Sequence, residues 1–200
     1  MKRFYEIISV ILHPLVVPTI TLILYIILLP NNYSSAQQLA LLSLVFVTTY
    51  LIPLLVLILF KKLKLIKTFN VNSIKEIKIA VAIMLVLFYL LGNTITNNSN
   101  MKEIGLLFYA TSAALTLIYV FFTFRLKLSI HLLSLGISTG FFIIVGFIYS
   151  HNIYGIVIAN ILLAGLVGNA RIYLKAAAPK EIYLGFFCGF IAPFGLYYIL

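Results

Sequence analysis

The sequence contains little acidic or thiol chemistry: Asp and Glu together number four, Asp is absent, and Cys188 is the single cysteine. A carboxylate or thiolate metal centre needs more ligands of these kinds than the chain can supply. We therefore expect no metal ion and no cofactor. One cysteine cannot form an internal disulfide, so the cysteine content says nothing about the redox compartment.

Charged residues are scarce, and apolar residues take their place. The 200 residues are 64% hydrophobic and 9% charged, and the mean hydropathy is +1.18. A soluble domain is typically about 45–50% apolar and about 25% charged, so this chain has too little polar surface to cover a globule in water. The composition predicts an integral membrane protein and excludes a disordered, collagen-like or disulfide-stapled chain.

Long apolar stretches recur throughout the chain, each near the length of about 20 residues that a membrane-spanning helix needs. Seven candidates lie near residues 7–29, 38–60, 78–96, 104–124, 130–149, 154–173 and 182–200. Backbone polar groups in lipid must be satisfied within their own segment, and these lengths suit helices. The sequence therefore predicts a single all-α transmembrane domain over residues 1–200, a bundle of about seven helices. The first stretch is too long for a cleavable signal peptide.

The basic residues are distributed unequally about these spans. One side of the membrane receives the N-terminus and the segments 61–77, 125–129 and 174–181, and 13 of the 14 Lys and Arg residues lie on or near it. Lys102 is the exception. Because cytoplasmic loops of membrane proteins carry an excess of Lys and Arg, we expect the N-terminus to be cytoplasmic.

The segment from Arg125 to His131 places polar groups at a span end, and Ser134, Ser138 and Thr139 follow within the next span. Ionisable groups at membrane depth are functional candidates by default. His131 can exchange a proton near neutral pH, and Lys127 and Ser129 offer hydrogen-bond donors to an anion. The structural alternative is that the basic side chains reach toward the headgroups and that His131 bonds to a neighbouring helix.

A second polar segment joins the last two spans. Arg171 lies about one turn inside the end of its span, deeper than a surface anchor usually sits. Glu181 falls in the first turn of the following helix, where a carboxylate suits the helix dipole. Gly185 and Gly189 form a small-residue pair of the kind that allows close packing of membrane helices.

Both polar segments lie on the same predicted side of the membrane, two spans apart, and the segment around Lys75 and Lys78 ends on that side as well. An even number of crossings returns a chain to the same face. We therefore expect one pocket for an anionic headgroup, lined by Lys127, Ser129, His131 and Arg171, with Lys75 or Lys78 at its edge.

This layout resembles the type 2 phosphatidic acid phosphatase (PAP2) superfamily, especially its compact bacterial seven-span members. Lys127-Leu-Ser129-Ile-His131 is similar to the second family motif, in its relaxed Lys and Ser-x-His form, and the string from Arg171 to Glu181 is similar to the third. The opening His13-Pro14 resembles the start of those members. The resemblance implies a seven-span, multi-pass protein of the bacterial inner membrane with a PAP2-like core.

The resemblance also implies a role for each matching residue. His131 takes the position of the general acid, and the positions of phosphate-binding residues fall on Lys127, Ser129, Arg171, Lys75 and Lys78. The nucleophilic histidine of the family is replaced by Ala177, which is inert, and Glu181 stands at the position of the orienting Asp. His13 lies within the first predicted span and His151 on the opposite side, so neither is expected to replace the nucleophile.

Because covalent phosphoryl chemistry needs its nucleophile, we expect a catalytically impaired homologue that binds a phospholipid or isoprenoid phosphate headgroup at the cytoplasmic interface. Its expected partners are membrane lipids, and nucleic acid is not among them. Two alternatives stay open: an active lipid phosphate phosphatase with a rearranged site, and a small transporter or scaffold whose basic residues only fix the topology. Convergence of Arg171, Lys127 and His131 on one pocket would favour the first two of these three functions.

Overall fold

The structure is a computed structural model of the chain, and it describes residues 2–30, 33–62, 74–97, 101–150 and 152–199. Within these ranges every regular element is a helix, which confirms the all-α prediction. The elements are α1 (Lys2–Ile11), α2 (Val17–Leu28), α3 (Ser35–Phe46), the π-helical turn η1 (Val47–Leu51), α4 (Ile52–Lys62), α5 (Ile74–Thr96), α6 (Lys102–Thr123), α7 (Ile130–Tyr149), α8 (Tyr154–Tyr173) and α9 (Pro179–Tyr197).

Five helices in the described part of the chain are long and apolar enough to cross a bilayer: Ser35–Lys62, Lys78–Thr96, Lys102–Thr123, Ile130–Tyr149 and Tyr154–Tyr173. The first of these runs without interruption through α3, η1 and α4. Their number and composition make the chain a multi-pass membrane protein, as the hydropathy predicts.

The expected count of seven spans is corrected in two places. The stretch 7–29 does not form one helix, because Pro14 lacks an N–H donor and restricts the residue before it, and α1 and α2 separate at residues 12–16. The 12 residues of α2 rise only about 18 Å, against a hydrocarbon core of about 30 Å. The stretch 182–200 lies mostly in α9, which begins with the charged residues of its first turn and is not among the five.

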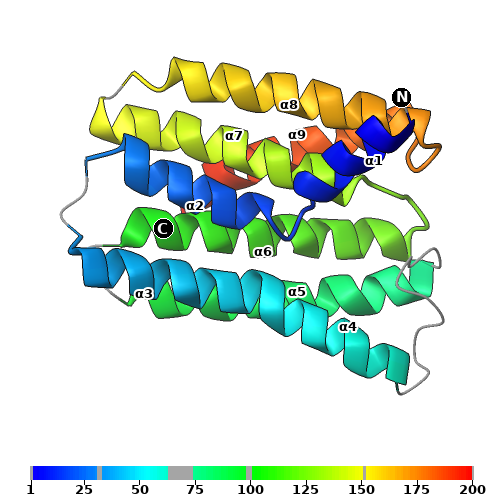
Figure 1. Cartoon of the computed structure of the whole chain (residues 1–200), viewed down its shortest axis with the longest axis horizontal. Coiled ribbons are helices and arrows are strands. Elements are labelled where there is room, and N and C mark those ends of the chain that lie inside the picture. Colours follow the sequence, from blue (N-terminus) through cyan, green and yellow to red (C-terminus); the bar gives the residue numbers. More distant parts are fainter. Residues whose placement is uncertain (1, 31–32, 63–73, 98–100, 151, 200) are drawn as a thin grey trace.

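The long helices lie side by side along the long axis of the molecule (Figure 1). The C-terminal ends of α2, α5 and α7 gather at one end of the bundle, together with the starts of α3, α6 and α8. The start of α1, the end of α6, the start of α7, the end of α8 and the start of α9 gather at the opposite end. That second end, the basic end, holds the described N-terminal residues and the segments 125–129 and 174–181, which the sequence assigns to one side of the membrane.

Two pairs of glycines bring α7 and α9 into backbone contact. On α9, a Cβ atom at Gly185 would collide with the backbone of Ser129, and one at Gly189 would collide with the backbone of Leu133. On α7, Gly136 and Gly140 meet the backbone of α9 in the same way. The small-residue pair predicted on α9 therefore serves close helix packing, and its partner is the equally spaced pair on α7.

Candidate functional site

The starts of α7 and α9 are joined directly at the basic end. The backbone N–H of Ser129, just before α7, donates a hydrogen bond to the carbonyl oxygen of Glu181 in the first turn of α9 at 3.0 Å. Gly185, one turn further along α9, lets the two backbones touch at Ser129. These contacts bring together two polar segments that lie more than 40 residues apart in the sequence.

His131, in the first turn of α7, faces a second histidine. The rings of His13 and His131 lie edge to face, with centroids 5.4 Å apart and an interplanar angle of 77°. His13 belongs to the connection between α1 and α2, where its Nδ1 accepts a hydrogen bond from the Leu15 N–H at 3.3 Å. The His131 imidazole also interacts with the backbone of Ser9 in α1.

Arg171, in the last turn of α8, completes this group. Its guanidinium interacts electrostatically with the imidazoles of His13 and His131 and with the carboxylate of Glu181. Its one hydrogen bond given by the structure is a long contact of 3.5 Å from a terminal guanidinium nitrogen to the carbonyl oxygen of Ala176. We call His13, Ser129, His131, Arg171 and Glu181 the basic-end cluster.

Two buried side-chain atoms in the described part of the chain have no hydrogen-bond partner, and both belong to the basic-end cluster. They are the hydroxyl oxygen of Ser129, a residue that is 6% exposed, and Nε of Arg171. Most buried polar side-chain atoms in proteins are hydrogen-bonded, because leaving one unpaired costs about 1–3 kcal/mol. Two unpaired donors within one cluster are what a site for an acceptor-rich group would offer.

Glu181 and Ala177, which stand at two catalytic positions of the family motif, both make contacts that stabilise the local fold. The Glu181 carboxylate accepts a hydrogen bond from the backbone N–H of Ala178 at 3.2 Å and so caps the start of α9. Ala177 donates its N–H to the carbonyl oxygen of Arg171 at 3.3 Å. It also packs against an apolar cluster that includes Leu132 and Ile182. No nucleophilic atom is present at residue 177.

The remaining predicted phosphate ligands have other surroundings where the structure describes them. Lys127 is exposed at the surface of the α6–α7 connection. Lys78, expected at the pocket edge, instead donates a hydrogen bond to the hydroxyl of Thr123 at 3.0 Å and lies 4.7 Å from the centroid of the Tyr119 ring. Both of these partners belong to α6. The side chain of Lys75 lies outside the described residues.

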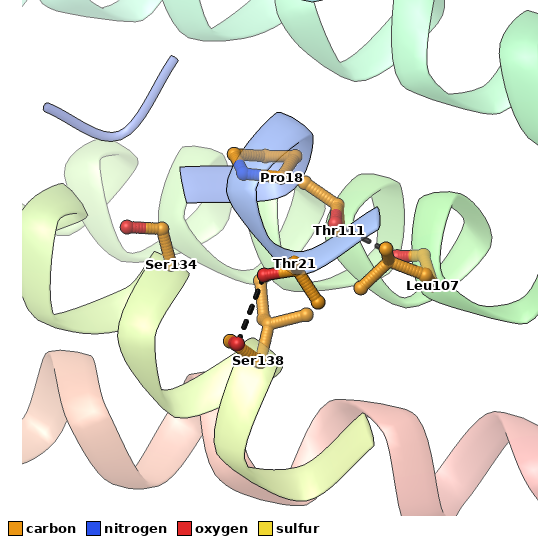
Figure 2. A pocket seen from close by; sticks show the side chains of 7 residues that line it. Pro18, Thr21, Leu107, Thr111, Ser134 and Ser138 are labelled. Atoms are coloured by element: carbon orange, nitrogen blue, oxygen red, sulfur yellow. Dashed lines mark hydrogen bonds between the residues drawn. The ribbon is translucent and has the colours of Figure 1, made fainter. Parts of the chain in front are cut away.

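A small cavity lies deeper in the bundle, between α2, α6 and α7 (Figure 2). It is lined by Pro18, Thr21, Leu107, Thr111, Ser134, Ile137 and Ser138. Its volume of about 10 Å³ is close to the minimum that holds one water molecule. No member of the basic-end cluster lines this cavity, so it is not the pocket that the sequence predicts.

Part of the cavity wall consists of hydroxyl groups that form hydrogen bonds. The hydroxyl of Ser138 accepts from the hydroxyl of Thr21 at 2.9 Å, drawn as a dashed line in Figure 2, and from the side-chain amide of Asn160 at 3.1 Å. The hydroxyl of Ser134 donates to the carbonyl oxygen of His131 at 2.9 Å. These bonds tie α2, α7 and α8 together directly beneath the basic-end cluster.

Sequence reasoning missed His13, because it placed the residue inside a continuous span. The signal that could have found it is the following Pro14, which interrupts that span and brings His13 to a helix junction. No group of three or more His, Cys, Asp or Glu side chains suited to a metal ion occurs among the described residues.

No protein-family model matches this chain, and no curated protein or solved structure matches it either. The resemblance to the phosphatase superfamily therefore depends on the motif residues alone and stays a prediction. The geometry of the basic-end cluster is the independent ground for a function.

Proposed function

We propose that this chain binds the phosphate headgroup of a membrane lipid, a phospholipid or an isoprenoid phosphate, at the basic-end cluster, without hydrolysing it. Arg171 supplies a permanent positive charge and a planar fork of donors that suits phosphate oxygens. The Ser129 hydroxyl and the two imidazoles supply further donors or acceptors. A phosphate group carries several acceptor oxygens and can pair with all of these groups at once.

The observation that carries this proposal is the pair of unpartnered buried atoms, the Ser129 hydroxyl oxygen and Arg171 Nε. Either atom alone could reflect local packing. Together they lie on elements from two distant parts of the sequence, α8 and the start of α7, and Glu181 interacts with both residues. This convergence favours anion binding over a role for the basic residues as topological anchors only.

The proposal of binding without turnover rests on Ala177. Its methyl group packs into the apolar cluster beneath the site and cannot attack phosphorus. Glu181 is engaged in capping α9 through the Ala178 N–H, which leaves it poorly placed to activate a water molecule. Loss of the nucleophile removes most of the rate enhancement of a covalent enzyme, on the order of 10⁶-fold in kcat for a serine protease.

A second candidate function is favoured by His13. Its ring centroid lies 5.4 Å from that of His131, so two imidazoles face one another beside an arginine. One imidazole could attack phosphorus while the other protonates the leaving oxygen. This arrangement would make the chain an active lipid phosphate phosphatase with a rearranged site, in which His13 takes the part of the missing nucleophile.

The proposal extends to the family, the cellular location and the membrane orientation of the chain. Under it, the chain is a compact bacterial member of the phosphatase superfamily in the inner membrane. The five long apolar helices cross the membrane, and the basic end faces the cytoplasm. The excess of Lys and Arg at that end supports the orientation.

Binding is tested with purified protein in nanodiscs and a fluorescent phosphatidate, with diacylglycerol as the phosphate-free ligand. Arg171→Gln is expected to weaken phosphatidate binding by at least about tenfold, because a charge-assisted hydrogen bond contributes about 1.5–3 kcal/mol. Arg125→Gln is the matched control: Arg125 is exposed at the same end of the bundle, and its loss should change binding little. Equal losses in the two variants would contradict the proposed site.

Turnover separates the two candidate functions. Incubation with radiolabelled phosphatidate, followed by a quench at high pH that preserves phosphohistidine, should trap no labelled protein if the chain only binds. Trapped label that disappears in His13→Gln and persists in Ala177→Ser would establish the rearranged phosphatase and overturn the proposal of binding without turnover.

A further inference from the structure

Helix α1 presents one face to the bundle. Tyr5, Ile8 and Ser9 are at least partly buried, as is Leu12 just past the end of the helix, and the spacing of the first three places them on a single side of α1. Ile8 and Leu12 pack against the same apolar cluster as Ala177. The inner face of α1 therefore packs on the apolar residues that lie beneath the basic-end cluster.

Two further contacts place α1 over the cluster itself. The ring of Tyr5 lies 4.6 Å, centroid to centroid, from the ring of Tyr173, which is two residues beyond Arg171 on α8. The backbone of Ser9 faces the imidazole of His131. Figure 1 shows α1 lying across the ends of α7 and α8 at the basic end. A ligand that approaches Arg171 from this side must displace α1.

The opposite face of α1 is apolar and has no protein partner in the described structure. Phe4, Ile7, Val10 and Ile11 are each more than half exposed. Lys2 and Arg3 precede them and are exposed as well. An outward apolar face with basic residues at one end is the pattern of a helix that lies in the interface of an anionic membrane.

The junction between α1 and α2 provides a place for movement. Residues 12–16 are not helical, and Pro14 prevents the two helices from joining. Turns and element ends of this kind absorb the backbone rotations of hinges. α2, by contrast, is fastened to α7 through Thr21 and Ser138, so rotation at the junction would move α1 alone.

We propose that α1 is an interfacial lid over the basic-end cluster, held closed by docking of its outer face on an anionic lipid surface and opened by rotation at residues 12–16. This proposal rests on the proposed function in that the lid would control entry of a phosphate headgroup to Arg171. The anionic surface contacts Lys2 and Arg3, the interfacial lipid tails contact the apolar face, and the site beneath stays covered.

The test measures access to the site without added phosphatidate. A thiol at the His131→Cys position, in a Cys188→Ala background, is labelled with an uncharged maleimide–polyethylene glycol in nanodiscs of phosphatidylcholine, with or without phosphatidylglycerol. Labelling should be slower in the anionic bilayer, by roughly fivefold for each basic residue near the surface. The difference should vanish in Lys2→Gln/Arg3→Gln. Tyr5→Ala should speed labelling by roughly two- to tenfold in both bilayers through loss of the aromatic pair.

A thiol at Leu126→Cys, exposed on the α6–α7 connection, is the control for reagent behaviour in the two bilayers, and its labelling rate should be the same in both. Equal rates at His131→Cys in the two bilayers, or an unchanged rate with Tyr5→Ala, would overturn the lid. Lys2→Gln/Arg3→Gln and Tyr5→Ala leave Arg171 unchanged, so slower labelling caused by a headgroup bound at Arg171 would persist in these variants, whereas slower labelling caused by the lid would be lost.

A second reporter covers the case in which His131→Cys does not fold. The chain contains no tryptophan, so Tyr5→Trp introduces a single tryptophan, which can be excited selectively, on the inner face of α1. Its quenching by acrylamide should be weaker in the anionic bilayer than in the zwitterionic one. Identical quenching in both bilayers would overturn the proposal.

Discussion

Gly185→Ala tests whether close contact between α7 and α9 holds the site together. A Cβ atom at this position would meet the backbone oxygen of Ser129 at 2.5 Å and its nitrogen at 3.2 Å. Backbone atoms cannot turn aside as a side chain can, so the start of α9 must shift away from the start of α7. Such a shift strains the hydrogen bond from the Ser129 N–H to the Glu181 carbonyl oxygen.

Two opposing effects determine how much Gly185→Ala changes the free energy of unfolding. Overpacking a tight contact costs about 1–3 kcal/mol, whereas replacing a helical glycine with alanine stabilises the helix by about 1 kcal/mol. Gly165→Ala isolates the second effect, because a Cβ atom at Gly165 on α8 meets nothing within 4 Å. The free energy of unfolding of Gly185→Ala should therefore lie about 1–3 kcal/mol below that of Gly165→Ala.

Reversible unfolding of the purified protein in mixed detergent micelles measures this difference, and phosphatidate binding of the same two variants measures its effect on the site. Gly165→Ala should bind as the wild type does, and Gly185→Ala should bind more weakly. If the two variants unfold at the same denaturant concentration, the contact with Ser129 does not constrain α9 and the reasoning is wrong.

Three further predictions concern other parts of the molecule. Ser138→Ala removes the acceptor of the Asn160 side-chain amide and should lower the free energy of unfolding by about 1 kcal/mol. The control is Thr139→Ala, whose hydroxyl bonds only within α7 and whose loss should have a smaller effect in the same detergent titration. In intact cells an impermeant thiol reagent should label Asn152→Cys and leave Leu126→Cys unlabelled; the reverse pattern would contradict a cytoplasmic basic end. Ala177→His should leave phosphatidate binding intact when assayed by fluorescence, and hydrolysis gained by this variant would show that the site lacks only a nucleophile.

Much of the architecture could be predicted because membrane helices are specified locally, by apolar length. The predicted ranges 130–149 and 154–173 coincide with α7 (Ile130–Tyr149) and α8 (Tyr154–Tyr173). The meeting of Ser129 with Glu181 also follows from simple counting, since two crossings return the chain to the same end of the bundle. The glycine pair on α9 predicted the contact that brings these residues together, although its partner pair on α7 went unnoticed.

The remainder depends on tertiary contacts that local patterns do not encode. His13 sits in an apolar run, and only the packing of the α1–α2 junction against α7 places it beside His131. Lys78 is long and flexible, so it could reach either the site or a neighbouring helix, and the Thr123 hydroxyl and Tyr119 ring on α6 capture it. Pro14 indicates a break between two helices, but a proline within an apolar run is equally compatible with a single kinked span.

The most direct test of phosphate binding at Arg171 is the distance from a bound lipid phosphorus to the arginine side chains. Protein labelled with ¹³C at arginine Cζ, reconstituted with phosphatidate, gives this distance by ³¹P–¹³C dipolar recoupling in solid-state NMR. A paired guanidinium and phosphate place these atoms about 4 Å apart. The proposed function predicts a strong coupling that disappears in Arg171→Gln and persists in Arg125→Gln. A coupling that survives Arg171→Gln, or its absence from the wild type at saturating phosphatidate, would contradict it.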